Sequence, residues 1–96
     1  MRNAEFQKSD LRNADLRGAI FRDSKLQNAD LRGADLRRAD LRFTNLKEVN
    51  LKEVNLERAN LRIGTELPPE EKMQGAVFKK ADVGPMVWLK LKDRLN

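Results

Sequence analysis

Basic side chains recur at every fifth residue of the repeat, and a row of this kind can bind phosphates or carboxylates. Nine of the twelve positions in this column are Arg or Lys. The column consists of Gln7, Arg12, Arg17, Arg22, Gln27, Arg32, Arg37, Arg42, Lys47, Lys52, Glu57 and Arg62. Residues 4–63 hold 13 basic and 10 acidic residues, so most of these charges have an opposite charge close in sequence. We therefore expect each arginine to pair with a neighbouring aspartate on a solvated face, with polyanion or nucleic-acid binding as the alternative.

A second column, two places before the basic one, is rich in oxygen ligands. Nine of its twelve members are Asp or Asn, and the exceptions are Glu5, Ile20 and Lys25. Stacked carboxylates and amides can hold a divalent cation. Short polar side chains also hydrogen-bond the backbone at tight turns. Because the column recurs along the whole repeat, we favour the turn interpretation and expect no metal site.

Residue types for catalysis are scarce in this chain. It contains no His, Cys or Tyr, and the available hydroxyls belong to Ser9, Ser24, Thr44 and Thr65. The chain has neither a glycine-rich phosphate loop nor a metal-ligand spacing, and its carboxylates repeat around the whole molecule. We expect no catalytic residue, no cofactor and no enzymatic activity.

A third column, made of Leu and Phe at every fifth residue, indicates which backbone structure positions the other two. Its members are Phe6, Leu11, Leu16, Phe21, Leu26, Leu31, Leu36, Leu41, Leu46, Leu51, Leu56 and Leu61. Two places before each lies a small or slender residue such as Ala14 or Ser24. A period of five gives no stripe on an α-helix and alternates faces on a flat strand. It fits a coil that turns a corner after every unit, points each central Leu at its axis and stacks on further coils.

Units such as Ala14-Asp15-Leu16-Arg17-Gly18 and Ala34-Asp35-Leu36-Arg37-Arg38 resemble the tandem A(D/N)LXX repeats of the pentapeptide-repeat proteins. The resemblance implies an all-β solenoid, a right-handed quadrilateral β-helix with four units in each 20-residue coil. We expect a single domain over residues 1–96 with three to four coils. Residues 4–63 form twelve repeats, 64–75 a projecting loop, 76–85 two further units and 86–96 a capping helix with Trp88, Leu91 and Leu95 over the core.

Three apolar residues break the solvent-facing rule on one face of this solenoid, where Phe43 and Ile63 hold equivalent outward positions one coil apart. Either they are scattered surface residues, or the 64–75 loop covers them, or they bind a partner. The residues of this candidate partner-binding site are Ile20, Phe43, Ile63, Arg22, Arg42 and Arg62.

The leading function is a non-catalytic protein-binding or scaffold module that presents flat faces of regularly spaced polar side chains. Polyanion or nucleic-acid binding through the arginine ladders is the alternative, which the lack of interleaved aromatic residues disfavours. The resemblance adds a third function, because some pentapeptide-repeat proteins resemble a DNA duplex and bind type II topoisomerases. Such a mimic needs one negative charge per ~1.7 Å. Residues 4–63 carry a net charge of +3, which has the wrong sign.

The N-terminal end of the stack is expected to be an open edge formed by Phe6, Leu11, Leu16 and Phe21. Only three residues precede the first repeat, too few to cover a coil. Open sheet edges recruit other chains, so we predict association with another protein or a homodimer through this edge. The chain has no apolar run long enough for a membrane span and no signal sequence, which makes the cytoplasm the default location.

Overall fold

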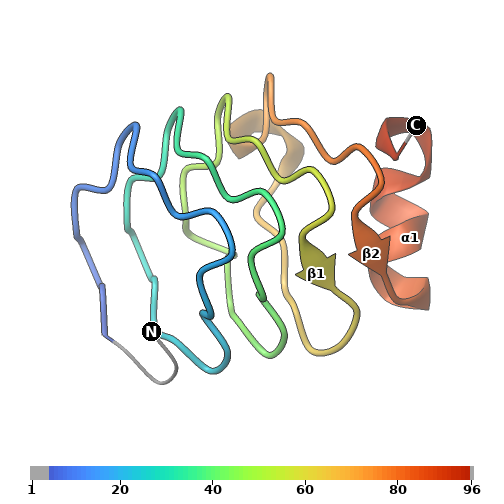
Figure 1. Ribbon diagram of the computed structural model, residues 1–96, viewed down its shortest axis with the longest axis horizontal. Helices are drawn as coiled ribbons and strands as arrows, with labels where there is room; N and C mark the ends of the chain where they lie inside the picture. The colour runs from blue at the N-terminus through green and yellow to red at the C-terminus, as the bar shows by residue number, and fades with distance from the viewer. Residues whose placement is uncertain (1–4, 96) are drawn as a thin grey trace.

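In the computed structural model the backbone winds into four successive coils, and a helix covers the C-terminal end (Figure 1). The structure describes residues 5–95. Along the first three coils, parallel bridges join residues 20 apart, for example Asp10 with Asp30. Each side of a coil is so short that, among residues 5–95, only β1 (Asn60–Leu61) and β2 (Asp82–Val83) count as strands, and these two pair in parallel. The chain is therefore a β-helix solenoid in which four five-residue units complete one coil.

Corners between the sides are turns with a left-handed third residue. In one of these turns the Ala14 N–H donates to the Leu11 carbonyl at 3.2 Å, and Asn13 between them has a φ of 58°. This is the pattern of a type II turn, which favours Gly or Asn at its third position. Gly18 and Gly33 occupy the same place at later corners, with φ of 67° and 70°. Gly and Asn at these positions could therefore have predicted the turns from the sequence, although the spacing of the central residues alone does not.

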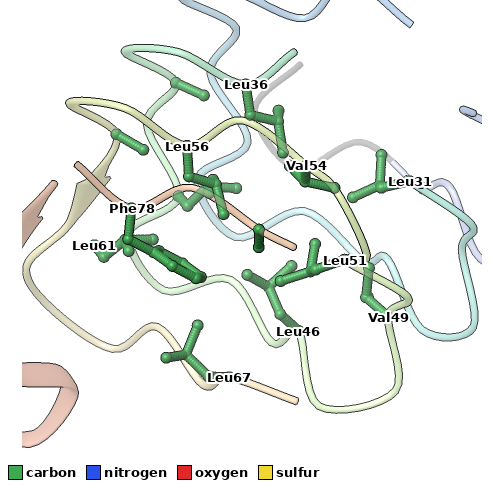
Figure 2. Close-up of a cluster of buried hydrophobic side chains, with 14 of the residues drawn as sticks. Leu31, Leu36, Leu46, Val49, Leu51, Val54, Leu56, Leu61, Leu67 and Phe78 are labelled. Carbon is green, nitrogen blue, oxygen red and sulfur yellow. The ribbon is translucent and has the colours of Figure 1, made fainter. Parts of the chain in front are cut away.

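Central Leu and Phe side chains fill the interior of the coils, and Figure 2 shows how they meet. Leu31, Leu36 and Leu51 are 0% exposed, and the slender residues of the same coils, such as Ala34 and Val54, are buried beside them. The prediction that Leu36 is fully buried is confirmed. Burial of these side chains is the main stabilising contribution, because the outward positions are almost entirely polar.

Residues 64–75 do not project as the expected loop but form half of a fourth coil. Glu66 bridges Asn45, and Leu67 and Met73 take central positions with only 6% and 2% of their surface exposed. The five-residue frame fails there because two successive steps, Leu61 to Leu67 and Leu67 to Met73, are six residues long. One of the extra residues is accommodated by the 3-10 helix η1 (Glu70–Lys72). Figure 2 shows Leu67 beside the central residues of earlier coils.

A short helix, α1 (Pro85–Leu91), covers the C-terminal end and is followed by the 3-10 helix η2 (Lys92–Arg94). Its core-facing residues are Val87 and Leu91, one turn apart, which are 7% and 0% exposed. The expected inward position of Trp88 is wrong, because its side chain is 48% exposed, with the Lys92 ammonium 5.7 Å from its ring. A helix with apolar residues on several faces does not reveal from its sequence which face is buried.

Arg94 fastens this cap to the last coil. One of its terminal nitrogens, Nη2, donates to the carbonyls of Met73 and Ala76 at 2.9 and 3.0 Å. Its guanidinium also lies 5.0 Å from the ring centre of the buried Phe78. In the coil below, the corresponding carbonyl of Val54 accepts a backbone N–H from the fourth coil. The arginine thus supplies the donor that a fifth coil would have provided.

Candidate functional site

Three exposed apolar side chains gather on the face of the solenoid that carries Phe21, as the sequence predicts. Ile20 lies in the first coil, Phe43 at a corner of the second and Ile63 in the third, with 40%, 46% and 53% of their surfaces exposed. We call these three residues the apolar patch. Residues 64–75 belong to the fourth coil, and although Gly64 contacts the Phe43 ring, both Phe43 and Ile63 stay exposed, so the expected cover by this segment is wrong.

Phe43 adopts a backbone conformation that a bulky residue rarely takes. Its φ is 60°, in the left-handed region, which costs an L-residue about 1–2 kcal/mol. Its ring lies across Gly64 so closely that a Cβ added to that glycine would be 2.5 Å from the ring atom Cδ1. On its other side the Arg22 guanidinium is 5.9 Å from the ring centre. Phe43 is therefore held in place at a corner, yet almost half of its surface faces solvent.

Ile63 is not equivalent to Phe43 in the stacking register. The Phe43 N–H donates to the Ile63 carbonyl at 2.8 Å, whereas at other corners the equivalent donor reaches the residue directly after the central one. One extra residue after Leu61 therefore moves Gly64, rather than Ile63, onto Phe43. The two side chains still lie on the same face one coil apart, but the expected equivalence is wrong.

A groove continues from the apolar patch along the N-terminal part of α1. It has a volume of about 500 Å³ and is lined by residues 62–66 on one side and by Gly84, Pro85 and Val87 on the other. The sequence does not predict this groove because it depends on how α1 packs against the fourth coil. It extends the exposed apolar surface from Ile63 to the cap.

Most arginines of the basic column form a two-pronged ion pair with the aspartate two residues earlier. In the first of these, Arg12 Nε and Nη2 donate to the two carboxylate oxygens of Asp10 at 2.9 and 2.8 Å. We call this arrangement an Asp–Arg fork. Five forks are present in residues 5–95: Asp10–Arg12, Asp15–Arg17, Asp30–Arg32, Asp35–Arg37 and Asp40–Arg42.

The forks hold the aspartates in their charged form. The hydrogen bond from the Arg12 side chain lowers the pKa of Asp10 from 3.8 to about 2, and the Arg17 side chain does the same for Asp15. The pKa of Asp40 is lowered in the same way by Arg42. The expected pairing of arginine with a neighbouring aspartate is therefore confirmed for five of the seven arginines of the column, whose positive charges are largely neutralised.

The three arginines of the candidate site differ in how they are paired. Arg42 is held by Asp40 at 2.7 Å, and Arg62 lies 3.8 Å from Asp82 in the fourth coil. Arg22 is half-buried beside Phe43 and forms no ion pair with any of residues 5–95. The cationic rim of the apolar patch therefore has one arginine whose charge is not neutralised.

The Asp/Asn column supports the turns through hydrogen bonds from the backbone to its side-chain oxygens. Its side-chain oxygens accept from the backbone N–H two residues later, as Asp10 does from Arg12 at 3.2 Å and Asn50 from Lys52 at 3.1 Å. Within residues 5–95, no three side chains of His, Cys, Asp or Glu converge on a point where an ion could sit. The hydroxyl of Thr44 donates to the Phe21 carbonyl at 2.8 Å inside the core.

At the N-terminal end, the predicted edge residues differ in burial. Phe21 is fully buried and Leu16 is 8% exposed, whereas Phe6 and Leu11 are only partly buried. The Phe6 and Phe21 rings meet edge to face with their centres 6.0 Å apart. Residues 1–4 lie outside the described residues. Association of this edge with a second copy or another protein stays a prediction.

Comparison with known protein families identifies the type of repeat. The profile of pentapeptide repeats matches the sequence in eight copies over residues 1–38 and 24–62. The chain belongs to the pentapeptide-repeat family. This match covers more than half of the chain and agrees with the coils described above.

Among solved structures, the pentapeptide-repeat protein resembles another member of its family, from the thylakoid lumen of Arabidopsis thaliana. The two are 25% identical with a TM-score of 0.36, and the match covers 95% of this chain and 72% of the other. No curated protein matches the sequence. In the part of this pentapeptide-repeat protein that the structure describes, no helix has the length and apolar character needed to cross a membrane.

Proposed function

We propose that this pentapeptide-repeat protein is a non-catalytic protein-binding module that docks its partner on the apolar patch and the adjoining groove. The coils act as a rigid scaffold whose outward side chains are set at fixed spacing. We also infer that the coils wind in the right-handed sense with four flat sides, as the family resemblance implies.

The observation that carries the proposal is Phe43. A bulky residue in the left-handed region costs stability, and an exposed ring recovers little of that cost through burial. The same place at other corners is held by Gly and Asn and also by charged residues such as Arg38 and Glu53, and within residues 5–95 Phe43 is the only large apolar residue with a positive φ. A large apolar ring that stays exposed at a corner, where other corners carry Gly or polar residues, supports a binding role for Phe43. Ile20 and Ile63 on the same face extend the exposed area beyond a single side chain.

The distribution of charge argues against the two alternative functions, polyanion binding and DNA mimicry. The five forks neutralise most of the arginine ladder, so it is a poor ligand for a row of phosphates. The positive net charge of the repeats argues against a DNA mimic. A protein surface with apolar and acidic groups fits the apolar patch and its cationic rim better.

Site-specific photo-crosslinking in an extract of the source organism tests the proposal. A photoreactive phenylalanine analogue in place of Phe43 should crosslink to a partner. The same analogue in place of Glu53, which holds the same turn position at another corner with a φ of 60°, should not.

Removing the apolar groups provides a second test. Phe43→Ser with Ile63→Ser should abolish partner capture. Val77→Ser with Leu89→Ser, which removes two other exposed apolar side chains, should leave it intact. Equal crosslinking from positions 43 and 53, or capture that survives the first double substitution, would contradict the proposal.

A further inference from the structure

In the first two coils, most arginines that follow a central residue are held in an Asp–Arg fork. Six arginines of this column occur in the first two coils, and five of them are held by the aspartate two residues earlier, at 2.7 to 2.8 Å. Arg22 is the exception. Its unit has Ile20 in the place of the aspartate, and Ile20 bridges Asp40 through the backbone, in register with an aspartate of the next coil.

Arg22 is consequently left without an ion-paired carboxylate. The carboxylate on which its charge acts is Asp40, whose pKa is lowered by the Arg42 side chain and, to a smaller extent, by the Arg22 charge. Arg22 forms no ion pair within residues 5–95, and its Nε is buried with no hydrogen-bond partner there. The aspartate stacked on its unit, Asp40, is already bound by Arg42 at 2.7 Å. A guanidinium that keeps unused donors beside apolar groups loses hydration without full compensation, so an added carboxylate would bind it strongly.

The surroundings of Arg22 belong to the apolar patch. The Phe43 ring lies 5.9 Å from its guanidinium carbon, and Ile20 is 40% exposed two residues before it. We propose that Arg22 is the specificity-determining residue of this surface and that it binds a carboxylate of the protein partner, with an apolar side chain of the partner against Phe43 and Ile20. This inference rests on the proposed function and adds the chemistry of the partner.

A protein carboxylate fits this site better than a phosphate chain. Nucleic acids gain affinity from many phosphate contacts, and they need a row of free cations. Here a single unneutralised guanidinium stands between apolar groups, since Arg42 is occupied by Asp40 and Arg62 lies 3.8 Å from Asp82. One carboxylate next to one apolar side chain satisfies all of these groups.

The test is a selection from a random dodecapeptide library displayed on phage, with the wild-type chain as bait and Ile20→Asp as counter-bait. The substitution should complete a sixth fork and occupy Arg22 from within. It should fold, because the chain already stacks forks at Asp10 and Asp30 and at Asp15 and Asp35. Selected peptides should carry Asp or Glu next to a large apolar residue.

Binding of the selected peptides is then measured by fluorescence polarisation. Affinity should fall roughly tenfold or more for Arg22→Gln, as the loss of a charge-assisted pair predicts, and equally for Ile20→Asp. Arg12→Gln, which removes a fork arginine on another face, should have no effect. Replacing Asp or Glu in the peptide by Asn or Gln should weaken binding as much as Arg22→Gln does.

The outcomes separate this inference from the proposed function. Peptides that depend on Phe43 but tolerate Arg22→Gln, or that lack acidic residues, would overturn the role of Arg22 and leave the apolar patch standing. Peptides that ignore both residues would overturn both proposals. Failure to recover any peptide that distinguishes wild type from Ile20→Asp would also overturn the role of Arg22, as would equal competition by inorganic phosphate.

Discussion

Arg94 offers the sharpest test of how the open end of the solenoid is closed. Replacing it by Met keeps an unbranched apolar stem but removes the guanidinium with its five N–H donors and its contact with the Phe78 ring. The carbonyls of Met73 and Ala76 then lose the Nη2 donor that lies 2.9 and 3.0 Å away. The ion pair with Glu70 is lost as well, but the Glu70 side chain is 72% exposed.

The magnitude follows from these contacts. Hydrogen bonds from a charged donor contribute about 1.5–3 kcal/mol each, and the exposed ion pair contributes less than about 1 kcal/mol. Both carbonyls share one nitrogen and lie near the end of the stack, where water replaces part of the loss. We therefore expect Arg94→Met to lower the free energy of unfolding by about 2–4 kcal/mol. Glu70→Gln should lower it by less than about 1 kcal/mol.

Urea unfolding followed by two probes separates undocking of the cap from unfolding of the coils. Trp88 is the only tryptophan and lies on α1, so its fluorescence reports on the cap, whereas circular dichroism reports on the whole chain. In Arg94→Met the fluorescence transition should occur at lower urea than the dichroism transition. Arg58→Met, an exposed control, should leave both unchanged. Wild-type stability of Arg94→Met, or an equal loss in Glu70→Gln, would refute the role of Arg94.

Three further predictions test the core, the forks and the corners. Leu36→Ala should cost about 2–5 kcal/mol by leaving a cavity, and thermal melting like wild type would contradict the five-residue frame. The pKa of Asp10, about 2, is lowered by the arginine two residues later. Because the folded value lies below the unfolded one, its contribution to stability is complete above about pH 4 and is lost as the pH falls through 2. Urea unfolding across this pH range should show that the free energy of unfolding falls less steeply in Asp10→Asn than in wild type. Identical pH profiles of the two proteins would refute this role of Asp10. Gly64→Ala places a Cβ 2.5 Å from the Phe43 ring, whereas Gly18→Ala meets nothing within 4 Å at nearly the same φ. Gly64→Ala should therefore destabilise the chain more and shift the Phe43 ring resonances in NMR spectra, and equal effects would contradict the packing described.

Local, strictly periodic features were the predictable part of this fold. The burial of central residues such as Leu36 follows from the spacing alone, because every unit must place its apolar side chain on the axis. Pairing within the forks follows for the same reason, since Asp10 and Arg12 leave the same face of one short side. Neither requires knowledge of how distant parts of the chain pack.

The predictions were wrong where the five-residue period changes and where the packing of distant segments determines which residues are buried. Two six-residue steps hide the central role of Leu67 and Met73, because the sequence does not show whether an extra residue leaves the coil or is absorbed within it. The buried face of α1 is similarly undetermined, since Val87, Trp88 and Leu91 are all apolar and only docking selects among them. The groove beside the apolar patch depends on both of these arrangements.

Because the repeat units share one geometry, residues that differ from the repeat pattern are the best guide to a candidate site. Each unit serves as an internal control for the others, so a departure at one position cannot be ascribed to a different backbone. Ile20 departs from the Asp/Asn column, and Phe43 departs from the Gly and polar residues that hold the other left-handed corners. These two departures lie 23 residues apart, and the repeat spacing already places them on the same face. The 20-residue coil brings both beside Arg22, and one carboxylate with an apolar neighbour would complement all three side chains.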